Sequence, residues 1–220
     1  MEKMQLTDRC DESFWERCWQ QENPEALHGY LRGYLNLRCE EIELFERAGI
    51  RTVCDAACGF GAYTLALASN GFAVRSFDVS PTAAALTREG LKRFGYDVEV
   101  RVADLLHTSY ANEEFGGAFA HSVLDHMTRA DAGAALTELC RIVRPGGLVL
   151  LSFDTAEEAD YAAPHETLPD GSLLYTGEGK RGGMIFHPYD REAIRSLVAG
   201  YVIVMERVNR KGEQLVVVKR

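Results

Sequence analysis

The sequence predicts an α/β fold built around a doubly wound, mostly parallel sheet, and three observations support this prediction. Short apolar runs of strand length alternate with helix-like runs between residues 51 and 154, which is typical of successive βαβ units. Glycine or proline marks several of the junctions between these runs. The chain has 220 residues, of which 46% are hydrophobic and 26% charged, as expected of an ordered domain with a sizeable core.

Residues 1–50 are expected to form an N-terminal helical cap. The run FWERCWQ has helical periodicity and places Trp15 and Trp19 on one face. A break follows at Pro24, a residue suited to the first turn of a second helix. From there the apolar spacing is again helical, and it ends at Gly49, which suits a helix C-cap.

Residues 51–220 are expected to form the main domain. Its first part holds five strand-like runs, with helix-like runs and turns between them. Ser80 suits the N-cap of one of these helices, and Pro81 suits its first position. The strand-like runs cover 51–57, 72–80, 98–104, 115–123 and 148–154, and the helix-like runs cover 62–70, 81–95 and 129–143.

The pattern changes after the fifth strand-like run. Residues 155–188 are expected to form a flap-like excursion, because two short β-like runs flank a glycine-rich turn there and predict a small hairpin. A helix-like run follows at 191–200. The runs 201–210 and 213–220 predict an antiparallel hairpin at the end of the chain.

Composition and charge exclude several classes of function. The formal net charge is −9, whereas proteins that grip a phosphate backbone usually carry a basic face, so no nucleic-acid partner is expected. No apolar run approaches the ~20 residues that span a bilayer, and the charged N-terminus lacks a signal-peptide core, so the protein is expected to be cytoplasmic. The six cysteines include no CxxC pair, which favours free thiols and no metal site.

A glycine loop between the first strand and its helix is the main candidate binding site, because such loops place backbone N–H groups around a ligand. Gly59 and Gly61 form the loop, but Thr64 occupies the last position of a dinucleotide-type GxGxxG pattern. Asp55, just before the loop, would repel a pyrophosphate and attract an ammonium or sulfonium group. These residues favour S-adenosylmethionine over a dinucleotide.

Two further acids end the next two strands. Asp78 can accept hydrogen bonds from both ribose hydroxyls of a nucleoside, although NAD-binding proteins use the same placement. Asp104 can accept a hydrogen bond from the exocyclic amine of adenine, while the N–H of Leu105 can donate one to a ring nitrogen. Three acids at consecutive strand ends would line the carboxyl edge of the sheet, where ligands of open α/β folds bind.

These motifs resemble those of the class I S-adenosylmethionine-dependent methyltransferases. VCDAACGFGAYTLALA resembles the first motif of that family, SFDVS its ribose motif and VADLL its adenine motif, and the resemblance continues to residue 154. It implies a Rossmann-like, seven-stranded sheet with an antiparallel last strand. It also implies cofactor contacts in and around the loop and at the strand ends: Asp55, Ala57, Cys58, Gly59, Gly61, Asp78, Val79, Asp104, Leu105 and His121.

Candidates for the acceptor side are less well defined. The FW-x-x-x-W spacing around Trp15 and Trp19 resembles thiopurine-type and tellurite-resistance-type methyltransferases, in which it would cover the cofactor, and Tyr30 and His187 are further lid or substrate candidates. Asp125 and His126 follow the fourth strand and are candidates for a general base. No NPPY-like tetrapeptide follows that strand, which argues against methylation of nucleic-acid amines.

The function expected from these features is methyl transfer from S-adenosylmethionine to a small-molecule acceptor by in-line displacement. A non-catalytic protein that binds S-adenosylmethionine is an alternative, because this fold has no mandatory catalytic residue. An NAD-dependent oxidoreductase is a second alternative, which Asp55 and Thr64 oppose.

Overall fold

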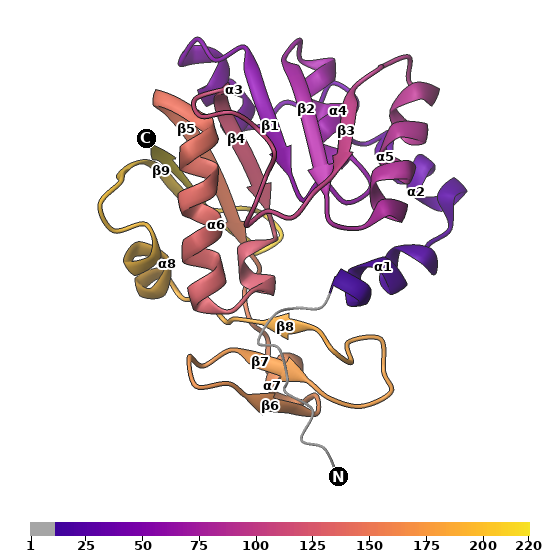
Figure 1. Cartoon of the computed structure of the whole chain (residues 1–220), viewed down its shortest axis with the longest axis vertical. Coiled ribbons are helices and arrows are strands. Elements are labelled where there is room, and N and C mark those ends of the chain that lie inside the picture. The colour runs from indigo at the N-terminus through magenta and orange to yellow at the C-terminus, as the bar shows by residue number, and fades with distance from the viewer. Residues whose placement is uncertain (1–11) are drawn as a thin grey trace.

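The computed structural model describes residues 12–220 and centres on a seven-stranded sheet (Figure 1). The strand order is β3-β2-β1-β4-β5-β10-β9, in which β10 runs antiparallel to both of its neighbours. The predicted fold class is therefore confirmed. The strands are β1 (Thr52–Ala56), β2 (Ala73–Asp78), β3 (Glu99–Val102), β4 (Phe115–His121), β5 (Val143–Phe153), β9 (Val202–Val208) and β10 (Gln214–Lys219).

Helices cover both faces of this sheet, and strand alternation supplies each face with apolar side chains. In β10, Leu215 and Val217 pack on one face, while Val216 and Val218 pack on the other. The first face is covered by α3 (Glu40–Arg47) and α4 (Ala62–Ser69), with α5 (Pro81–Arg93) beside α4. The second face is covered by α6 (Arg129–Ile142) and α8 (Arg191–Leu197).

Local capping follows the sequence signals. The Ser80 hydroxyl accepts the N–H of Ala83 at 3.0 Å, and Pro81 opens α5. Asn23 caps α2 (Pro24–Leu31) through the N–H groups of Glu25 and Ala26. Both helix starts are thus where the N-cap and proline preferences predict them.

The N-terminal segment contains α1 (Glu12–Gln20) before α2, and the part of the expected cap at residues 1–11 lies outside the described residues. The second amphipathic run of this segment is not one helix, because residues 32–39 separate α2 from α3. Asn36 takes a left-handed φ of 56°, which an α-helix does not accommodate, and its N–H donates to the Ser69 hydroxyl at 2.9 Å.

β5 begins earlier than predicted. It starts at Val143 and includes Pro145-Gly146-Gly147, which precede the predicted strand at 148–154. The Gly146 N–H donates to the Arg220 carbonyl at 2.8 Å, and the Arg220 N–H donates to the Gly147 carbonyl at 3.0 Å. Pairing with the end of the chain therefore holds this segment extended.

The excursion after β5 forms a small separate sheet, and a one-turn helix, η1 (Leu124–His126), follows β4. β7 (Leu173–Tyr175) pairs with β8 (Ile185–Phe186) as the predicted hairpin, and β6 (His165–Thr167) adds a third strand after α7 (Glu158–Ala162). Figure 1 shows α1 and this three-stranded sheet on the side to which the arrowheads of β2 and β3 point. Within residues 12–220, no helix is long and apolar enough to cross a membrane.

Candidate functional site

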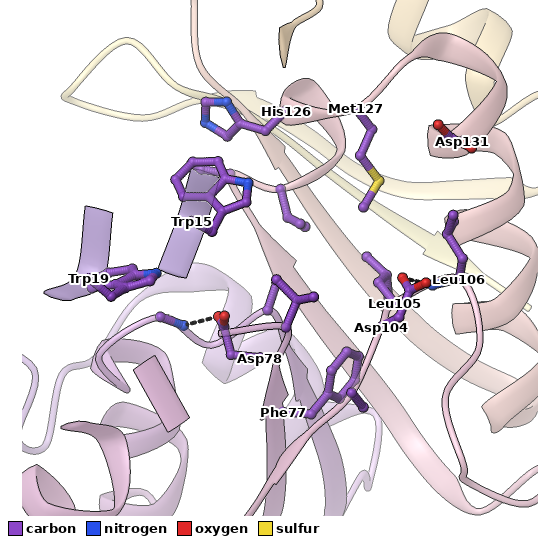
Figure 2. A pocket seen from close by; sticks show the side chains of 16 residues that line it. Trp15, Trp19, Phe77, Asp78, Asp104, Leu105, Leu106, His126, Met127 and Asp131 are labelled. Carbon is purple, nitrogen blue, oxygen red and sulfur yellow. Dashed lines mark hydrogen bonds between the residues drawn. The ribbon is translucent and has the colours of Figure 1, made fainter. Parts of the chain in front are cut away.

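A pocket with a cavity volume of about 360 Å³ lies at the carboxyl ends of the central strands, beneath α1 (Figure 2). This volume lies within the range of small-molecule sites. The lining residues come from α1, the glycine loop, the ends of β2, β3 and β4, η1 and the start of α6. They are Trp15, Trp19, Ala57, Gly59, Phe77, Asp78, Val79, Ala103, Asp104, Leu105, Leu106, Ser122, Val123, His126, Met127 and Asp131.

The glycine loop turns sharply because three of its residues have left-handed backbone angles. Ala57, Gly59 and Gly61 have φ values of 52°, 56° and 87°. Ala57 thus takes a conformation that glycine adopts without strain. A side chain on Gly61 would place its Cβ 2.7 Å from Cγ2 of Thr87, so glycine there lets the loop and α4 approach α5 closely.

Asp78 joins the glycine loop to the end of β2. Its Oδ2 accepts the Gly59 N–H at 2.8 Å, and its Oδ1 accepts the Ser80 N–H at 2.9 Å. A carboxylate offers about four acceptor positions, so each oxygen can accept another hydrogen bond from a ligand in the pocket. Burial raises the pKa of Asp78 above its usual value, against the lowering effect of these N–H groups.

Asp104 occupies the equivalent position after β3. Its Oδ1 accepts the Leu106 N–H at 2.9 Å, which fixes the carboxylate at the pocket wall (Figure 2). Leu105 beside it is buried and belongs to the main core, so this part of the wall is rigid. A carboxylate next to an apolar surface can accept a hydrogen bond from an amine at the edge of a flat ring, while the ring itself packs on the apolar surface.

Asp55 lies behind the loop rather than on the pocket wall, and only 2% of its surface is exposed. The Thr64 hydroxyl donates to Asp55 Oδ2 at 2.5 Å, so the threonine that departs from the dinucleotide pattern is the partner of the acid. Burial raises the pKa of Asp55 to about 7. A carboxyl group with this pKa can lose its proton when a cation approaches.

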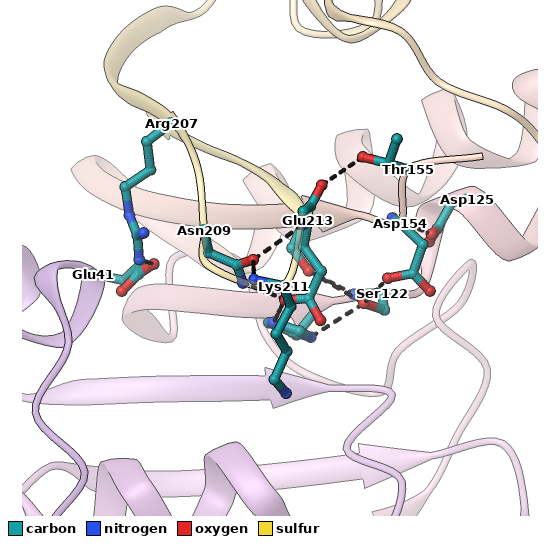
Figure 3. Close-up of polar contacts among 12 residues, drawn as sticks. Glu41, Ser122, Asp125, Asp154, Thr155, Arg207, Asn209, Lys211 and Glu213 are labelled. Carbon is teal, nitrogen blue, oxygen red and sulfur yellow. Dashed lines mark hydrogen bonds and ion pairs between the residues drawn. The ribbon is translucent and has the colours of Figure 1, made fainter. Parts of the chain in front are cut away.

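The side chain of His121 turns away from the pocket. Its ring stacks on Tyr63 with centroids 4.3 Å apart, and its Nε2 lies 3.4 Å from Glu213 Oε2. Glu213 comes from the β9–β10 turn, where Asn209 Oδ1 accepts the N–H groups of Lys211 and Glu213 (Figure 3). Hydrogen bonding to His121 lowers the pKa of Glu213.

Helix α1 covers the pocket mouth through its two tryptophans. The Trp19 ring lies against the glycine loop, since a Cβ on Gly59 would be 3.0 Å from it. The Trp15 ring meets His126 edge-on, with centroids 5.0 Å apart. Both indoles line the pocket, so the spacing in the sequence brings them together over one site.

Glu16 attaches α1 to the start of α5, and the sequence analysis did not identify it. Its carboxylate accepts the Ser80 and Thr82 hydroxyls, each at 2.6 Å, and the Thr82 N–H at 3.1 Å. These hydrogen bonds lower the pKa of Glu16 to about 2. No sequence signal links a glutamate in one helix to a helix start some 65 positions away.

The predicted site residues thus fall into groups. Ala57, Gly59, Asp78, Val79, Asp104 and Leu105 line the pocket, together with the lid candidates Trp15 and Trp19 and the base candidate His126. Asp55, Gly61 and His121 lie behind or beside it, as does Cys58, whose Sγ is 3.7 Å from the Thr87 hydroxyl.

The other candidates also lie outside the pocket wall. Tyr30 is 55% exposed and contacts Phe60 and Tyr34. His187 directly follows β8 and is buried, with its Nδ1 2.9 Å from the Ser172 hydroxyl. Asp125 is fully buried within η1. Sequence reasoning missed the apolar wall residues Phe77, Leu106 and Met127, which have no signature beyond apolarity.

Comparison with known proteins identifies a methyltransferase domain. Residues 53–147 match the family model described as "Methyltransferase domain". Over 97 residues, the chain is 31% identical to a ubiquinone biosynthesis O-methyltransferase of Methylobacterium sp. (strain 4-46), covering 44% of this chain and 38% of the relative. Over 110 residues, it is 36% identical to an Arabidopsis thaliana tRNA (carboxymethyluridine(34)-5-O)-methyltransferase, covering 49% of this chain and 25% of the relative.

Among solved structures, the chain resembles an S-adenosylmethionine-dependent methyltransferase from Methanosarcina mazei. The TM-score is 0.69 at 18% identity, and the match covers 83% of this chain and 98% of the other. At this identity the likeness establishes the fold. The chain therefore spans well under half the length of the curated relatives, whereas its fold matches nearly all of this structure.

Proposed function

We propose that the chain is a class I S-adenosylmethionine-dependent methyltransferase and that it transfers a methyl group from this cofactor to a small-molecule acceptor. The observation that carries the proposal is the pocket itself, in which Asp78 and Asp104 stand on the wall and Asp55 lies behind the loop. We assign cofactor binding to residues 51–220 and coverage of the site to the preceding helices.

The residues present fit the cofactor. Asp78 would accept the ribose hydroxyls, and Asp104 with Leu105 would receive the adenine against the apolar wall of Leu106 and Met127. The N–H groups of the glycine loop would meet the methionine carboxylate. Asp55, whose pKa of about 7 leaves it partly ionised at neutral pH, would stabilise the positive charges from behind the loop.

An acidic, enclosed site supports a small acceptor. α1 and the small sheet flank the mouth of the pocket: Trp15 meets His126, and the His126 and Phe186 rings lie 6.1 Å apart. The net charge of −9 disfavours a polyanionic acceptor. The Methylobacterium relative is named for ubiquinone biosynthesis, which is consistent with a small acceptor, while the tRNA methyltransferase makes RNA the competing class to test.

The chemistry requires little from the protein beyond placement and exclusion of water. S-adenosylmethionine, when bound, supplies a methyl group activated by its sulfonium. The rings of Trp15 and Trp19 would exclude water and favour a cation, with cation–π attraction on the order of 0.5–2 kcal/mol. His126 is on the wall of the pocket and is the titratable group placed to accept a proton from an acceptor hydroxyl.

Cofactor binding is tested by calorimetry with S-adenosylhomocysteine and, separately, with NAD. We expect the chain to bind S-adenosylhomocysteine but not NAD. Asp78→Ala should weaken the binding of S-adenosylhomocysteine by ~1.5–3 kcal/mol, because a charged hydrogen-bond acceptor is lost. Asp97→Ala, at an exposed position in the loop before β3, is the matched control and should leave the affinity unchanged. Equal affinity of Asp78→Ala and the native chain would overturn the ribose assignment.

Methyl transfer is tested with the labelled cofactor and separate pools of phenols, thiols, amines, carboxylic acids and transfer RNA. We expect label in one of the small-molecule pools. Label in the RNA pool alone would contradict the proposed acceptor class. Tight cofactor binding without label in any pool would instead favour the non-catalytic alternative.

A further inference from the structure

We propose that Asp125, His126 and Asp154 bind a divalent metal ion at the acceptor side of the pocket. One ligand atom from each residue lies within 4.8 Å of the other two. The residues come from η1 and from the position after β5, so the fold brings them together although Asp154 is distant in sequence. The inference rests on the proposed function, because it concerns the acceptor side of the same site.

Asp125 supplies the observation that points to a ligand. The residue is fully buried, and its Oδ1 has no hydrogen-bond partner. A buried carboxylate oxygen without a partner destabilises the folded chain, and does so more strongly when the group is charged. Buried charges in proteins are normally paired or coordinate a metal, and a cation between these three residues would satisfy this oxygen.

Hydrogen bonds hold the two carboxylates of this cluster in place. The Asp154 N–H donates to Asp125 Oδ2 at 2.8 Å, and the His187 N–H donates to the Asp125 carbonyl at 2.7 Å. The Ser122 hydroxyl donates to Asp154 Oδ1 at 3.2 Å (Figure 3). Such partners around a ligand set are what orient metal ligands in proteins.

Ser122 is also strained in the backbone, with a left-handed φ of 48°. Its N–H is held by the Ser152 hydroxyl at 2.9 Å, so β5 maintains this conformation. Non-glycine residues are disfavoured in this region, and those that occur concentrate at functional sites. Here the conformation places Ser122 between the pocket, which it lines, and the carboxylate of Asp154.

The donor set indicates the class of ion and of acceptor. Two carboxylates with an imidazole suit borderline-hard divalent ions such as Mn²⁺. Three protein ligands leave coordination positions open, and His126 and Ser122 place the cluster against the pocket wall. An acceptor with oxygen donors could complete the coordination, and the ion would lower the pKa of the bound hydroxyl so that its proton is released to solvent before methyl transfer. With the ion bound, His126 is a ligand of the metal and no longer the base that takes this proton.

The test titrates Mn²⁺ into the full chain in the absence of cofactor and detects binding by electron paramagnetic resonance. We expect one saturable site per chain, and at least a tenfold weaker site in Asp154→Asn and in His126→Ala. Asp97→Asn and His165→Ala are matched controls, because both residues lie outside the cluster, and they should bind Mn²⁺ normally. Absence of saturable binding to the native chain, or native binding by both ligand variants, would overturn the site.

Two further measurements separate this inference from the proposed function. S-adenosylhomocysteine affinity in EDTA should be unchanged in Asp154→Asn, which also shows that the variant is folded. If the chain binds the cofactor and transfers methyl groups but has no Mn²⁺ site, the metal inference is wrong and the proposed function stands. A Mn²⁺ site in a chain that does not bind the cofactor would contradict the proposed function and leave the ion site standing.

Discussion

Asp55 shows how burial can adapt an acid to a cationic ligand. Its carboxyl has an ordinary pKa of about 3.9 in an unfolded chain, but burial raises the pKa to about 7 in the folded protein. Between these values the folded state holds a proton that the unfolded state has lost. The contribution of Asp55 to the free energy of unfolding therefore falls as the pH rises from about 4 to about 7, and levels off above 7.

Replacing Asp55 tests this dependence. Asp55→Asn keeps an acceptor for the Thr64 hydroxyl but does not titrate, so the variant should gain stability relative to the native chain as the pH rises from 5 to 8. Urea unfolding at pH 5, 6, 7 and 8 measures the difference. A constant difference across this range would show that Asp55 has an ordinary pKa.

Gly61 carries a second constraint at this scale, because both its backbone and its surroundings exclude a side chain. Its φ is +87°, and an added Cβ would lie 2.7 Å from Thr87 Cγ2 and 2.9 Å from Leu91 Cδ1. Gly61→Ala should lower the free energy of unfolding by about 2–4 kcal/mol, from backbone strain and overpacking together.

Gly71 offers the matched control for Gly61. It has a similar φ of +84°, but nothing lies within 4 Å of an added Cβ. Gly71→Ala should therefore show only the backbone part, about 1–2 kcal/mol. Denaturant unfolding of both variants compares the two effects. Equal losses would mean that the approach of α4 to α5 does not depend on Gly61.

At the scale of elements, the Glu16 carboxylate attaches α1 to the start of α5, while the tryptophans of α1 contact the pocket wall. The pKa of Glu16 is about 2, so the group stays ionised between pH 5 and 9 and the attachment should not change over this range. The stabilisation from this lowered pKa is present above about pH 4 and is lost as the pH falls toward 2. Since the two tryptophans of the sequence are both on α1, tryptophan fluorescence reports on this helix specifically.

Glu16→Gln tests whether the attachment closes the site. The variant should show red-shifted tryptophan emission and weaker S-adenosylhomocysteine binding, because a neutral amide accepts fewer and weaker hydrogen bonds from Ser80 and Thr82. Glu22→Gln, an exposed glutamate just after α1, is the control. Native emission and native affinity in Glu16→Gln would show that the lid does not need this contact.

At the scale of the whole molecule, ligand binding and folding are linked, because the pocket walls come from segments that meet only in the folded chain. S-adenosylhomocysteine at 100 times its Kd should stabilise the protein by about 2.7 kcal/mol. For a chain of this length the midpoint of thermal unfolding should rise by about 5–11 °C. Calorimetric or fluorescence melting measures the shift, and an equal rise with NAD would contradict the assigned cofactor class.

Much of the fold could be predicted because its signals are local. Strand-length apolar runs, the Ser80-Pro81 helix start and the glycines after α3, α4 and α5 act within a few residues of themselves. The boundaries that were missed depend on distant contacts. β5 extends back to Val143 because its first residues pair with Arg220, and α2 and α3 separate where Asn36 is held by Ser69.

Local sequence patterns were enough to predict the alternation of strands and helices between residues 51 and 154, the glycine loop and the acids at three consecutive strand ends, but not η1, α7 or β6. The predicted positions follow from hydrophobic period and turn chemistry, and parallel strands bring their carboxyl ends to one edge. Only the tertiary structure decided which of these side chains face the pocket. It turns His121 toward Glu213, encloses Asp55 with Thr64 and attaches α1 through Glu16. The physical reason is that orientation and burial depend on packing between segments far apart in the chain, which local patterns do not encode.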